Sequence, residues 1–341
     1  MIPYLLFPLL IFFSASLGVI ISPLWGSAPF VLILVIIPII DSLLPKMQNP
    51  EKNLKNGVTF DLTLILVFPF IVMLFFSGMW VASETNSMLG AGFLGASIGM
   101  ATGSVGLPAA HELIHRTGKI FQSIGLLTLL FCFYGHFRIE HIHGHHSKVA
   151  TVSDPATARL GENVYIFLIR CVTKGWWSAW KIEKRLIERK EQPLFSYKNR
   201  MILYFFLQLI LLISTWFFCD VKGLIFLTTH TVVAILLLEI VEYIQHYGLQ
   251  RLKTDQAEIE PYNKKHAWDC RHCATNWSTF NLGLHSDHHS KPGKRFPLLS
   301  NQAPQNEMPF SYPIMILLAL VPPIWFKIMN HRIKNKIIPS Y

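Results

Sequence analysis

Six long stretches free of lysine and arginine constrain this chain more than any other feature of its sequence. Each has about the 20 residues that a helix needs to cross a hydrocarbon core roughly 30 Å thick. They run over residues 4–21, 28–44, 62–82, 88–110, 201–218 and 223–246. With 52% hydrophobic and 15% charged residues, the composition departs from that of soluble proteins. We predict an all-α integral membrane protein with six transmembrane helices, forming a single domain over residues 1–341.

The distribution of basic residues predicts the orientation of these spans. In the six-span arrangement, Lys222 is the only one of the 30 lysines and arginines on its side of the membrane. The short loop after the second span contributes Lys46, Lys52 and Lys55. Because basic residues near span ends stay on the cytosolic side, we expect both termini, the insert 111–200 and the tail 247–341 to be cytosolic. The membrane is expected to be a bacterial inner membrane, and the net charge of +10 suits anionic lipid and an acidic partner.

Histidines form a repeated pattern in three short segments. In the first, His111 and His115 are four residues apart, which places both imidazoles on one face of a helix. The other two segments supply His141, His145 and His146, and His285, His288 and His289. A single histidine is more often a hydrogen-bonded residue than a ligand, but three such groups together indicate a metal centre.

Carboxylates accompany the histidines. Glu112, Glu140 and Asp287 lie inside the three segments, where each is expected to accept the free ring N–H of a ligand and fix its tautomer. Asp154 and Glu242 are weaker candidates for the same role. Near the end of the last span, Glu239, Glu242 and His246 share one helical face, and ionisable groups inside a span are costly and usually functional.

The number and type of these ligands point to two metal ions. Nine imidazoles exceed the four ligands of one zinc ion, and the thiolates of iron–sulfur or copper(I) sites are lacking. Iron(II) with open positions suits oxygen chemistry in apolar surroundings, and zinc at two hydrolytic sites is the alternative. Cys270 and Cys273 have the spacing of a zinc site, but no second pair accompanies them, so a metal is not expected there.

A shared metal centre requires all histidine segments to lie on one side of the membrane. If residues 120–134 crossed the bilayer, the first and second segments would be on opposite sides, so this short apolar stretch is expected to return to the same face. Residues 313–326, interrupted by two prolines, are likewise expected at the interface. Residues 162–189 mix tryptophans with basic residues and predict a helix at the level of the lipid headgroups.

At the histidine segments the sequence resembles the integral-membrane alkane monooxygenase family, which includes the xylene side-chain monooxygenases and lies within the membrane fatty acid desaturase-like superfamily. Three segments resemble the histidine boxes of that family, and a fourth resembles an intervening motif that contributes one more histidine. The four segments are residues 111–116, 140–146, 285–289 and 242–248. Two departures stand out: Gln245 where alkane hydroxylases usually have glutamate, and Leu282-Gly283-Leu284 where a more polar leader is usual.

The resemblance implies two non-haem irons, O₂, and electrons from rubredoxin or an iron–sulfur (ferredoxin-type) donor. The implied metal ligands are His111, His115, His141, His145, His146, His246, His285, His288 and His289. His143 falls at a variable position and is left out. We expect a monooxygenase that hydroxylates a terminal C–H bond of an alkane or alkyl-aromatic substrate. A fatty-acyl desaturase or lipid hydroxylase remains an alternative, whereas a metal transporter is disfavoured because the histidines gather at one face.

Overall fold

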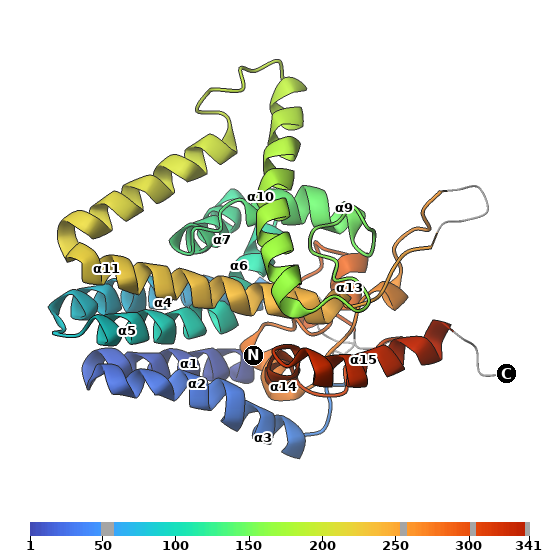
Figure 1. The fold of residues 1–341 in the computed structure, drawn as a ribbon, viewed down its shortest axis with the longest axis horizontal. Coiled ribbons are helices and arrows are strands. Elements are labelled where there is room, and N and C mark those ends of the chain that lie inside the picture. Colours follow the sequence, from blue (N-terminus) through green and yellow to red (C-terminus); the bar gives the residue numbers. More distant parts are fainter. Residues whose placement is uncertain (49–57, 253–257, 301–304, 338–341) are drawn as a thin grey trace.

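The fold was taken from a computed structural model, which describes residues 1–48, 58–252, 258–300 and 305–337. Over these residues every regular element is a helix, and the only β-type pairing is an isolated bridge between Asp269 and Glu307 (Figure 1). The all-α prediction is therefore confirmed. Lys52 and Lys55, part of the charge argument for orientation, lie outside the described residues.

Five segments of the described chain are helical, apolar and long enough to cross a membrane. They are α1 (Ile2–Ile20), the run Pro23–Leu43, α4 (Val58–Glu84), the run Met88–Ile114 and α11 (Arg200–His246). Helix α11 has 47 residues and is therefore about 70 Å long, more than twice the hydrocarbon thickness of about 30 Å. Its backbone leaves the helical conformation at Asp220, where φ is 53°, and the helix bends (Figure 1). Counting the two halves of α11 separately gives the six spans predicted.

Two of the spans contain a turn of π-helix, which the sequence pattern did not predict. The second span runs through η1 (Pro23–Ser27), α2 (Ala28–Val31), η2 (Leu32–Ile36) and α3 (Ile37–Leu43), and the fourth through α5 (Met88–Ala101), η3 (Thr102–Gly106) and α6 (Leu107–Ile114). The π turns η2 and η3 end two residues before Pro38 and Pro108. A proline ring clashes with the carbonyl four residues earlier, and the wider turn accommodates that carbonyl.

Small residues bring the fourth span close to the second half of α11. A Cβ added at Gly99 would lie 2.6 Å from the carbonyl oxygen of His230, and one at Gly103 would lie 3.1 Å from Cα of Ala234. Backbones can approach this closely only where no side chain intervenes. The contact fixes the end of α11, including His246, relative to α6, which bears His111.

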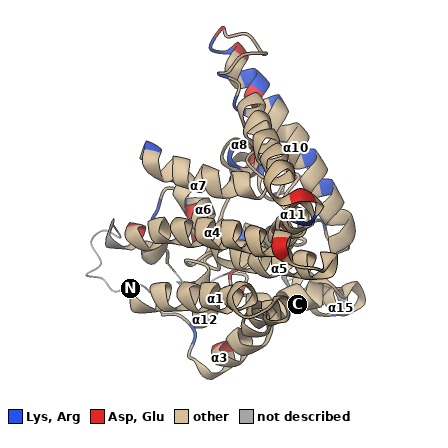
Figure 2. Cartoon of the chain, turned by 90° about the vertical axis from the view of Figure 1, so that its left-hand side faces the viewer, with Lys and Arg blue, Asp and Glu red and all other residues tan. Residues whose placement is uncertain are grey.

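The remaining helices are short or run across the spans. They are α7 (Lys119–Phe131), α8 (Phe137–Glu140), η4 (His141–His145), α9 (His146–Lys148), α10 (Val164–Glu188), η5 (Lys264–His266), α12 (Cys273–Ser278), α13 (His285–Ser290), η6 (Phe296–Leu298), α14 (Tyr312–Ala319) and α15 (Pro322–Ile337). With 13 residues, α7 is about 20 Å long and too short for a span. Helices α14 and α15 meet at a bend of 118°. Helix α10 runs across the direction of the spans, and its ribbon is blue at several positions, where the residue is Lys or Arg (Figures 1 and 2).

Carboxylates from distant segments hold two of these short helices. Asp41, near the end of the second span, accepts from the amide of Ala274 at 2.7 Å and from the hydroxyl of Thr275 at 2.6 Å, so it caps the start of α12. Asp269 accepts from the amide of Ser286 at 2.7 Å and from its hydroxyl at 2.5 Å, at the first turn of α13. Each carboxylate satisfies amides that a helix start leaves unpaired, and Asp41 also ties the tail to the second span.

We predict that replacing Gly99 by alanine lowers the thermal unfolding temperature of the detergent-solubilised protein by several degrees. The added methyl overlaps the backbone of α11, and overpacking of this kind costs about 1–3 kcal/mol. Gly92→Ala is the matched control, because its nearest new contact would be 3.4 Å from a methyl of Ile225. That variant should unfold at the wild-type temperature or above it. Equal unfolding temperatures for both variants would contradict the close approach at Gly99.

Candidate metal centre

Nine histidines from four parts of the chain meet in two adjacent groups. Within each group, one ring nitrogen per residue lies within 4.8 Å of the others. The five-histidine group comprises His111, His115, His141, His146 and His288, and the four-histidine group comprises His145, His246, His285 and His289. These are the nine residues singled out from the sequence. His143 belongs to neither group, and its side chain is exposed.

The local helix geometry decides which histidine joins which group. His111 and His115, four residues apart on α6 and the residue after it, both belong to the five-histidine group. On α13, His285 and His289 are also four residues apart and both belong to the four-histidine group, whereas His288 points to the other. The expectation that histidines spaced i, i+4 act as a pair is met in these two segments.

The second segment departs from that expectation. Residues 141–145 form the π turn η4, in which hydrogen bonds join residues five apart. As a result His141 pairs with His146, and their Nε2 atoms are 3.1 Å apart, while His145 joins the four-histidine group. Gly144 is required inside this turn because a Cβ there would overlap the carboxylate of Glu140. Within this segment Nε2 of His141 faces that of His146, while His141 and His145 also belong, with Glu242, to a third group that could hold a metal.

The Nε2 atoms of neighbouring rings face one another at short range. In the five-histidine group, His111 and His141 are 2.8 Å apart and His146 and His115 are 3.2 Å apart. In the four-histidine group, His246 and His285 are 2.9 Å apart, and His145 and His289 are 3.2 Å apart. Ligands at right angles around one ion are about 3.0 Å apart when the metal–nitrogen bonds are about 2.1 Å. The spacing of the donor atoms in each group is therefore compatible with a bound metal ion.

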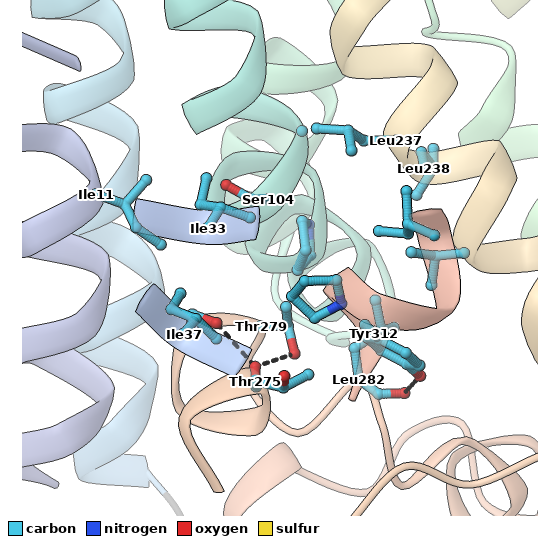
Figure 3. Close-up of a pocket in the computed structure, with 16 residues that line it drawn as sticks. Ile11, Ile33, Ile37, Ser104, Leu237, Leu238, Thr275, Thr279, Leu282 and Tyr312 are labelled. Carbon is cyan, nitrogen blue, oxygen red and sulfur yellow. Dashed lines mark hydrogen bonds between the residues drawn. The ribbon is translucent and has the colours of Figure 1, made fainter. Parts of the chain in front are cut away.

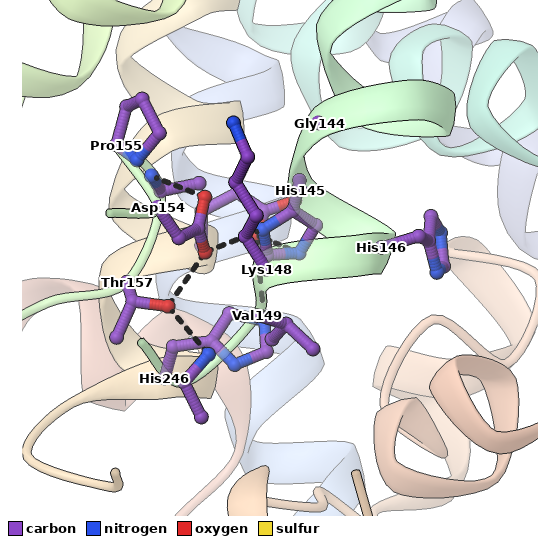
Figure 4. Close-up of polar contacts among 12 residues, drawn as sticks. Gly144, His145, His146, Lys148, Val149, Asp154, Pro155, Thr157 and His246 are labelled. Carbon is purple, nitrogen blue, oxygen red and sulfur yellow. Dashed lines mark hydrogen bonds and ion pairs between the residues drawn. The ribbon is translucent and has the colours of Figure 1, made fainter. Parts of the chain in front are cut away.

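Asp154 is the carboxylate that orients a ring. Its Oδ2 accepts from Nδ1 of His145 at 2.9 Å and from the hydroxyl of Thr157 at 2.6 Å, and its Oδ1 accepts from the amide of Ala156 at 3.1 Å (Figure 4). Burial opposes its ionisation, but the interactions with His145 and Thr157 outweigh burial and hold the pKa of Asp154 below its usual value. An ionised Asp154 keeps the proton of His145 on Nδ1 and turns Nε2 toward the other ligands.

The three carboxylates favoured from the sequence have other nearest partners. Glu112 accepts from Arg116 at 3.0 Å, and its other oxygen lies 4.0 Å from Nδ1 of His288. Glu140 accepts from Ser178 at 3.2 Å, and burial followed by the charge of Asp154 raises its pKa to about 7.

Asp287 turns away from the rings. It accepts from Lys264 and Lys294, both at 2.7 Å. The position of a carboxylate within a histidine segment therefore did not indicate which one contacts a ring. Asp154, the weaker candidate, does so.

The two departures from the family pattern contact each other. Gln245 donates from Nε2 to the carbonyl of Leu282 at 3.1 Å and to the hydroxyl of Tyr312 at 2.6 Å. Gly283 leaves no room for a side chain, because an added Cβ would lie 2.6 Å from Oδ1 of Asn276. Gln245 therefore supports the segment that leads into α13.

The CxxC pair does not form a metal site in the described part of the chain. Cys273 donates to the carbonyl of Pro45 at 3.1 Å, and Cys270 lies 3.4 Å from Nδ1 of His272. All five cysteines are free thiols in the structure. Among the described residues, neither cysteine of the pair belongs to a group that could hold a metal.

A narrow cavity of about 50 Å³ lies between the spans and the tail (Figure 3). Its walls come from the second span, η3 and α6, α11, α12 and α14, and include Ile33, Ile37, Leu237 and Leu238. Pro108 and Leu282, which also line it, precede His111 and His285 by three residues each. The cavity thus lies beside the segments that carry the histidines.

The hydroxyl groups along this cavity are already used within the protein. Ser104 donates to the carbonyl of Met100 at 2.7 Å, and Ser278 and Thr279 donate to the carbonyl of Thr275 at 2.9 and 2.8 Å. Thr275 and Tyr312 donate to Asp41 and Leu282 in the same way. The cavity therefore presents an apolar surface, with no free hydroxyl donor among its lining residues.

The fold and the site together define a class: a helical integral membrane protein whose histidines build a metal centre beside an apolar cavity. Comparison with known proteins agrees with this class. The family model described as fatty acid desaturase matches residues 86–317.

The chain is similar along most of its length to curated monooxygenases. It is 32% identical to alkane 1-monooxygenase 1 of Pseudomonas aeruginosa, over 91% of this chain and 83% of that protein. It is 33% identical to alkane 1-monooxygenase of Acinetobacter baylyi, over 88% and 74%. It is 28% identical to the hydroxylase component of xylene/toluene monooxygenase of Pseudomonas putida, over 89% and 80%. The chain belongs to the alkane 1-monooxygenase family, within the desaturase-like proteins, and is an oxidoreductase of that kind.

We predict that Asp154→Asn weakens iron(II) binding about 10- to 100-fold, the usual effect of removing a carboxylate that orients a ligating histidine. The amide no longer fixes the proton of His145 on Nδ1. Nε2 of His145 is then free to bind a metal in a smaller fraction of molecules. Competition with a chelator of known affinity measures the change. Asp287→Asn, whose carboxylate contacts two lysines, is the matched control and should bind iron nearly as the wild type does. The reverse order of effects would contradict the role given to Asp154.

Proposed function

We propose that this protein is a di-iron hydroxylase that inserts one atom of O₂ into a terminal C–H bond of an alkane or alkyl-aromatic substrate. One observation carries the proposal: two converging groups of imidazoles lie beside a cavity whose walls are apolar. Membership in the alkane monooxygenase family supports the same reaction. The reaction consumes O₂, two electrons and two protons, and yields the alcohol and water.

Each of the nine grouped histidines is proposed to donate one ring nitrogen to an iron ion. Their neutral rings and the scarcity of thiolates favour iron(II) over the soft metals, and iron supplies the oxygen-activating chemistry when it is bound. The protein's own contribution is to position these rings, through Asp154 for His145 and through Asp269 for the start of α13. Glu112, near His288, and Glu140, beside Gly144, are proposed to adjust the charge around the site. Asp287 is proposed to hold α13 through its two lysines.

The apolar cavity is proposed to bind the hydrocarbon chain. Burial of each CH₂ group contributes about 0.8 kcal/mol, so a chain of several carbons binds without any polar contact. The hydroxyl groups along the wall already donate hydrogen bonds within the protein, so water finds no free donor there. This favours exclusion of water from the path to the metal centre.

The electrons are proposed to come from rubredoxin or a ferredoxin-type donor in the cytosol. The histidine groups lie at the ends of α6 and α11, and the basic helix α10 is near the same end of the molecule (Figure 1). We place this end, with the insert 111–200 and the tail 247–341, on the cytosolic side of a bacterial inner membrane, together with both termini. A basic face on that side suits an acidic electron donor.

We expect the purified protein to contain close to two irons per chain. Alanine at His141, His146 or His288 should lower both the iron content and the activity, since each removes a nitrogen from a group. Alanine at His136 or His331, which belong to neither group, should leave the iron content nearly unchanged. Metal analysis by plasma mass spectrometry measures both. Active protein that contains zinc in place of iron would refute the proposed centre.

We expect membranes that contain this protein, supplied with reduced rubredoxin or ferredoxin and a medium-chain alkane or methyl-substituted aromatic, to form a primary alcohol. Under ¹⁸O₂ the alcohol should carry one ¹⁸O atom, and under H₂¹⁸O it should carry none. Mass spectrometry of the extracted product distinguishes the two. An acyl chain returned with a new double bond and no label would instead establish a desaturase, the activity named by the matching family model.

A further inference from the structure

Glu242, a weaker candidate for orienting a histidine ring, is a buried carboxylate beside the four-histidine group. It lies on α11, one turn before His246, and is 4% exposed. Its Oε2 has no hydrogen-bond partner among the described residues. An unpaired buried carboxylate costs several kcal/mol unless a positive charge lies beside it. The position of Oε2 therefore calls for a cation.

The nearest atoms to this oxygen are ring nitrogens that also face other histidines. Oε2 of Glu242 lies 3.7 Å from Nε2 of His145 and 3.6 Å from Nε2 of His246. The same Nε2 atoms lie 3.2 Å from His289 and 2.9 Å from His285, within the four-histidine group. Glu242 thus points at the place where the nitrogens of that group converge.

A hydrogen bond from His145 does not explain this arrangement. The Nδ1 of His145 donates to Asp154 at 2.9 Å, so in the neutral ring Nε2 carries a lone pair and no proton. Two acceptors then face each other across 3.7 Å, an arrangement that a metal cation between them would stabilise. Ligands 120° apart around one ion are about 3.6 Å apart when the bonds are about 2.1 Å. The distances to both histidines match this value.

The two groups differ by one ligand, and Glu242 accounts for the difference. The five-histidine group has five nitrogens, whereas the other has four. The carboxylate nearest to the first group, Glu112, approaches His288 from the Nδ1 side, and Arg116 already occupies its other oxygen. Glu242 also lies within 4.8 Å of a ring nitrogen of His141 in the first group, but its nearer ring nitrogens are those of His145 and His246, at 3.7 and 3.6 Å. Glu239, one turn before Glu242, is also excluded because Tyr134 and Cys171 each donate to it at 2.7 Å.

On the basis of the proposed di-iron function, we propose that Glu242 is a tenth metal ligand, whose Oε2 completes a five-coordinate site with His145, His246, His285 and His289. The two iron sites are then chemically unequal: one has five neutral ligands, and the other has four neutral ligands and one anion.

The test compares Glu242→Gln with Glu239→Gln, two buried carboxylates on the same helix. Metal-free protein in detergent is titrated anaerobically with iron(II), and ⁵⁷Fe Mössbauer spectra are recorded at saturation. For wild type we expect two irons and two quadrupole doublets of equal area. Glu242→Gln should bind one of the two irons at least 10-fold more weakly and change one doublet only. Glu239→Gln should keep both affinities and both doublets.

The thermal stability of the metal-free protein separates a ligand from a structural residue. Because glutamine has the shape of glutamate without its charge, metal-free Glu242→Gln should unfold at the wild-type temperature or above it, while the increase caused by iron should be smaller. Glu242→His, which offers a neutral nitrogen at the same position, should recover part of the lost affinity.

Two outcomes would overturn the assignment, and they are distinguishable. If wild type binds two irons and Glu242→Gln binds both with unchanged affinity and spectra, Glu242 only balances charge, and the di-iron function stands. If wild type binds no iron at the four-histidine group, the proposed di-iron function fails, and the assignment of Glu242 fails with it.

Discussion

The structure depends on the convergence of ring nitrogens. Their lone pairs repel one another unless a shared cation lies between them. Pairs of Nε2 atoms 2.8–3.2 Å apart occur in both histidine groups, and these rings come from α6, η4, α11 and α13. These four elements are separated from one another along the chain, so tertiary contacts must bring them together. The close glycine contacts between the fourth span and α11, and the capping of α13 by Asp269, bring them together. Lipid-facing spans therefore serve as the rigid frame for a centre at their ends.

The sequence predicted the parts of this arrangement that follow from local periodicity. Span lengths follow from hydropathy, and His111 and His115 share a group because four residues are about one helical turn. It did not predict that His145 joins the four-histidine group, because the register of a π turn depends on tertiary packing such as that of Gly144 against Ile182 of α10. It also ranked Asp287 above Asp154, since proximity along the chain does not determine which carboxylate faces a ring.

The two departures from the family pattern, Gln245 and Leu282-Gly283-Leu284, lie beside the apolar cavity. Gln245 has no metal-facing role in the structure, since its amide supports Leu282 and contacts Tyr312. Leu282 and Tyr312 both line the apolar cavity. The substitution before the intervening histidine is therefore connected with the shape of the cavity wall, through the segment that precedes α13. A single side-chain amide thus contacts both a residue of the cavity wall and the segment that leads into the histidines of α13.

The π turn η4 has a consequence for how this protein tolerates change. A π turn holds one residue more than the α-helical turn it replaces, and the exposed His143 lies on its outer side. The identity of that residue is free to vary, because its side chain belongs to neither histidine group. The length of the segment is not free, because deleting one residue would rotate every later ring by about 100° around the helix axis. Across the family, this segment should accept substitutions at that position and reject deletions.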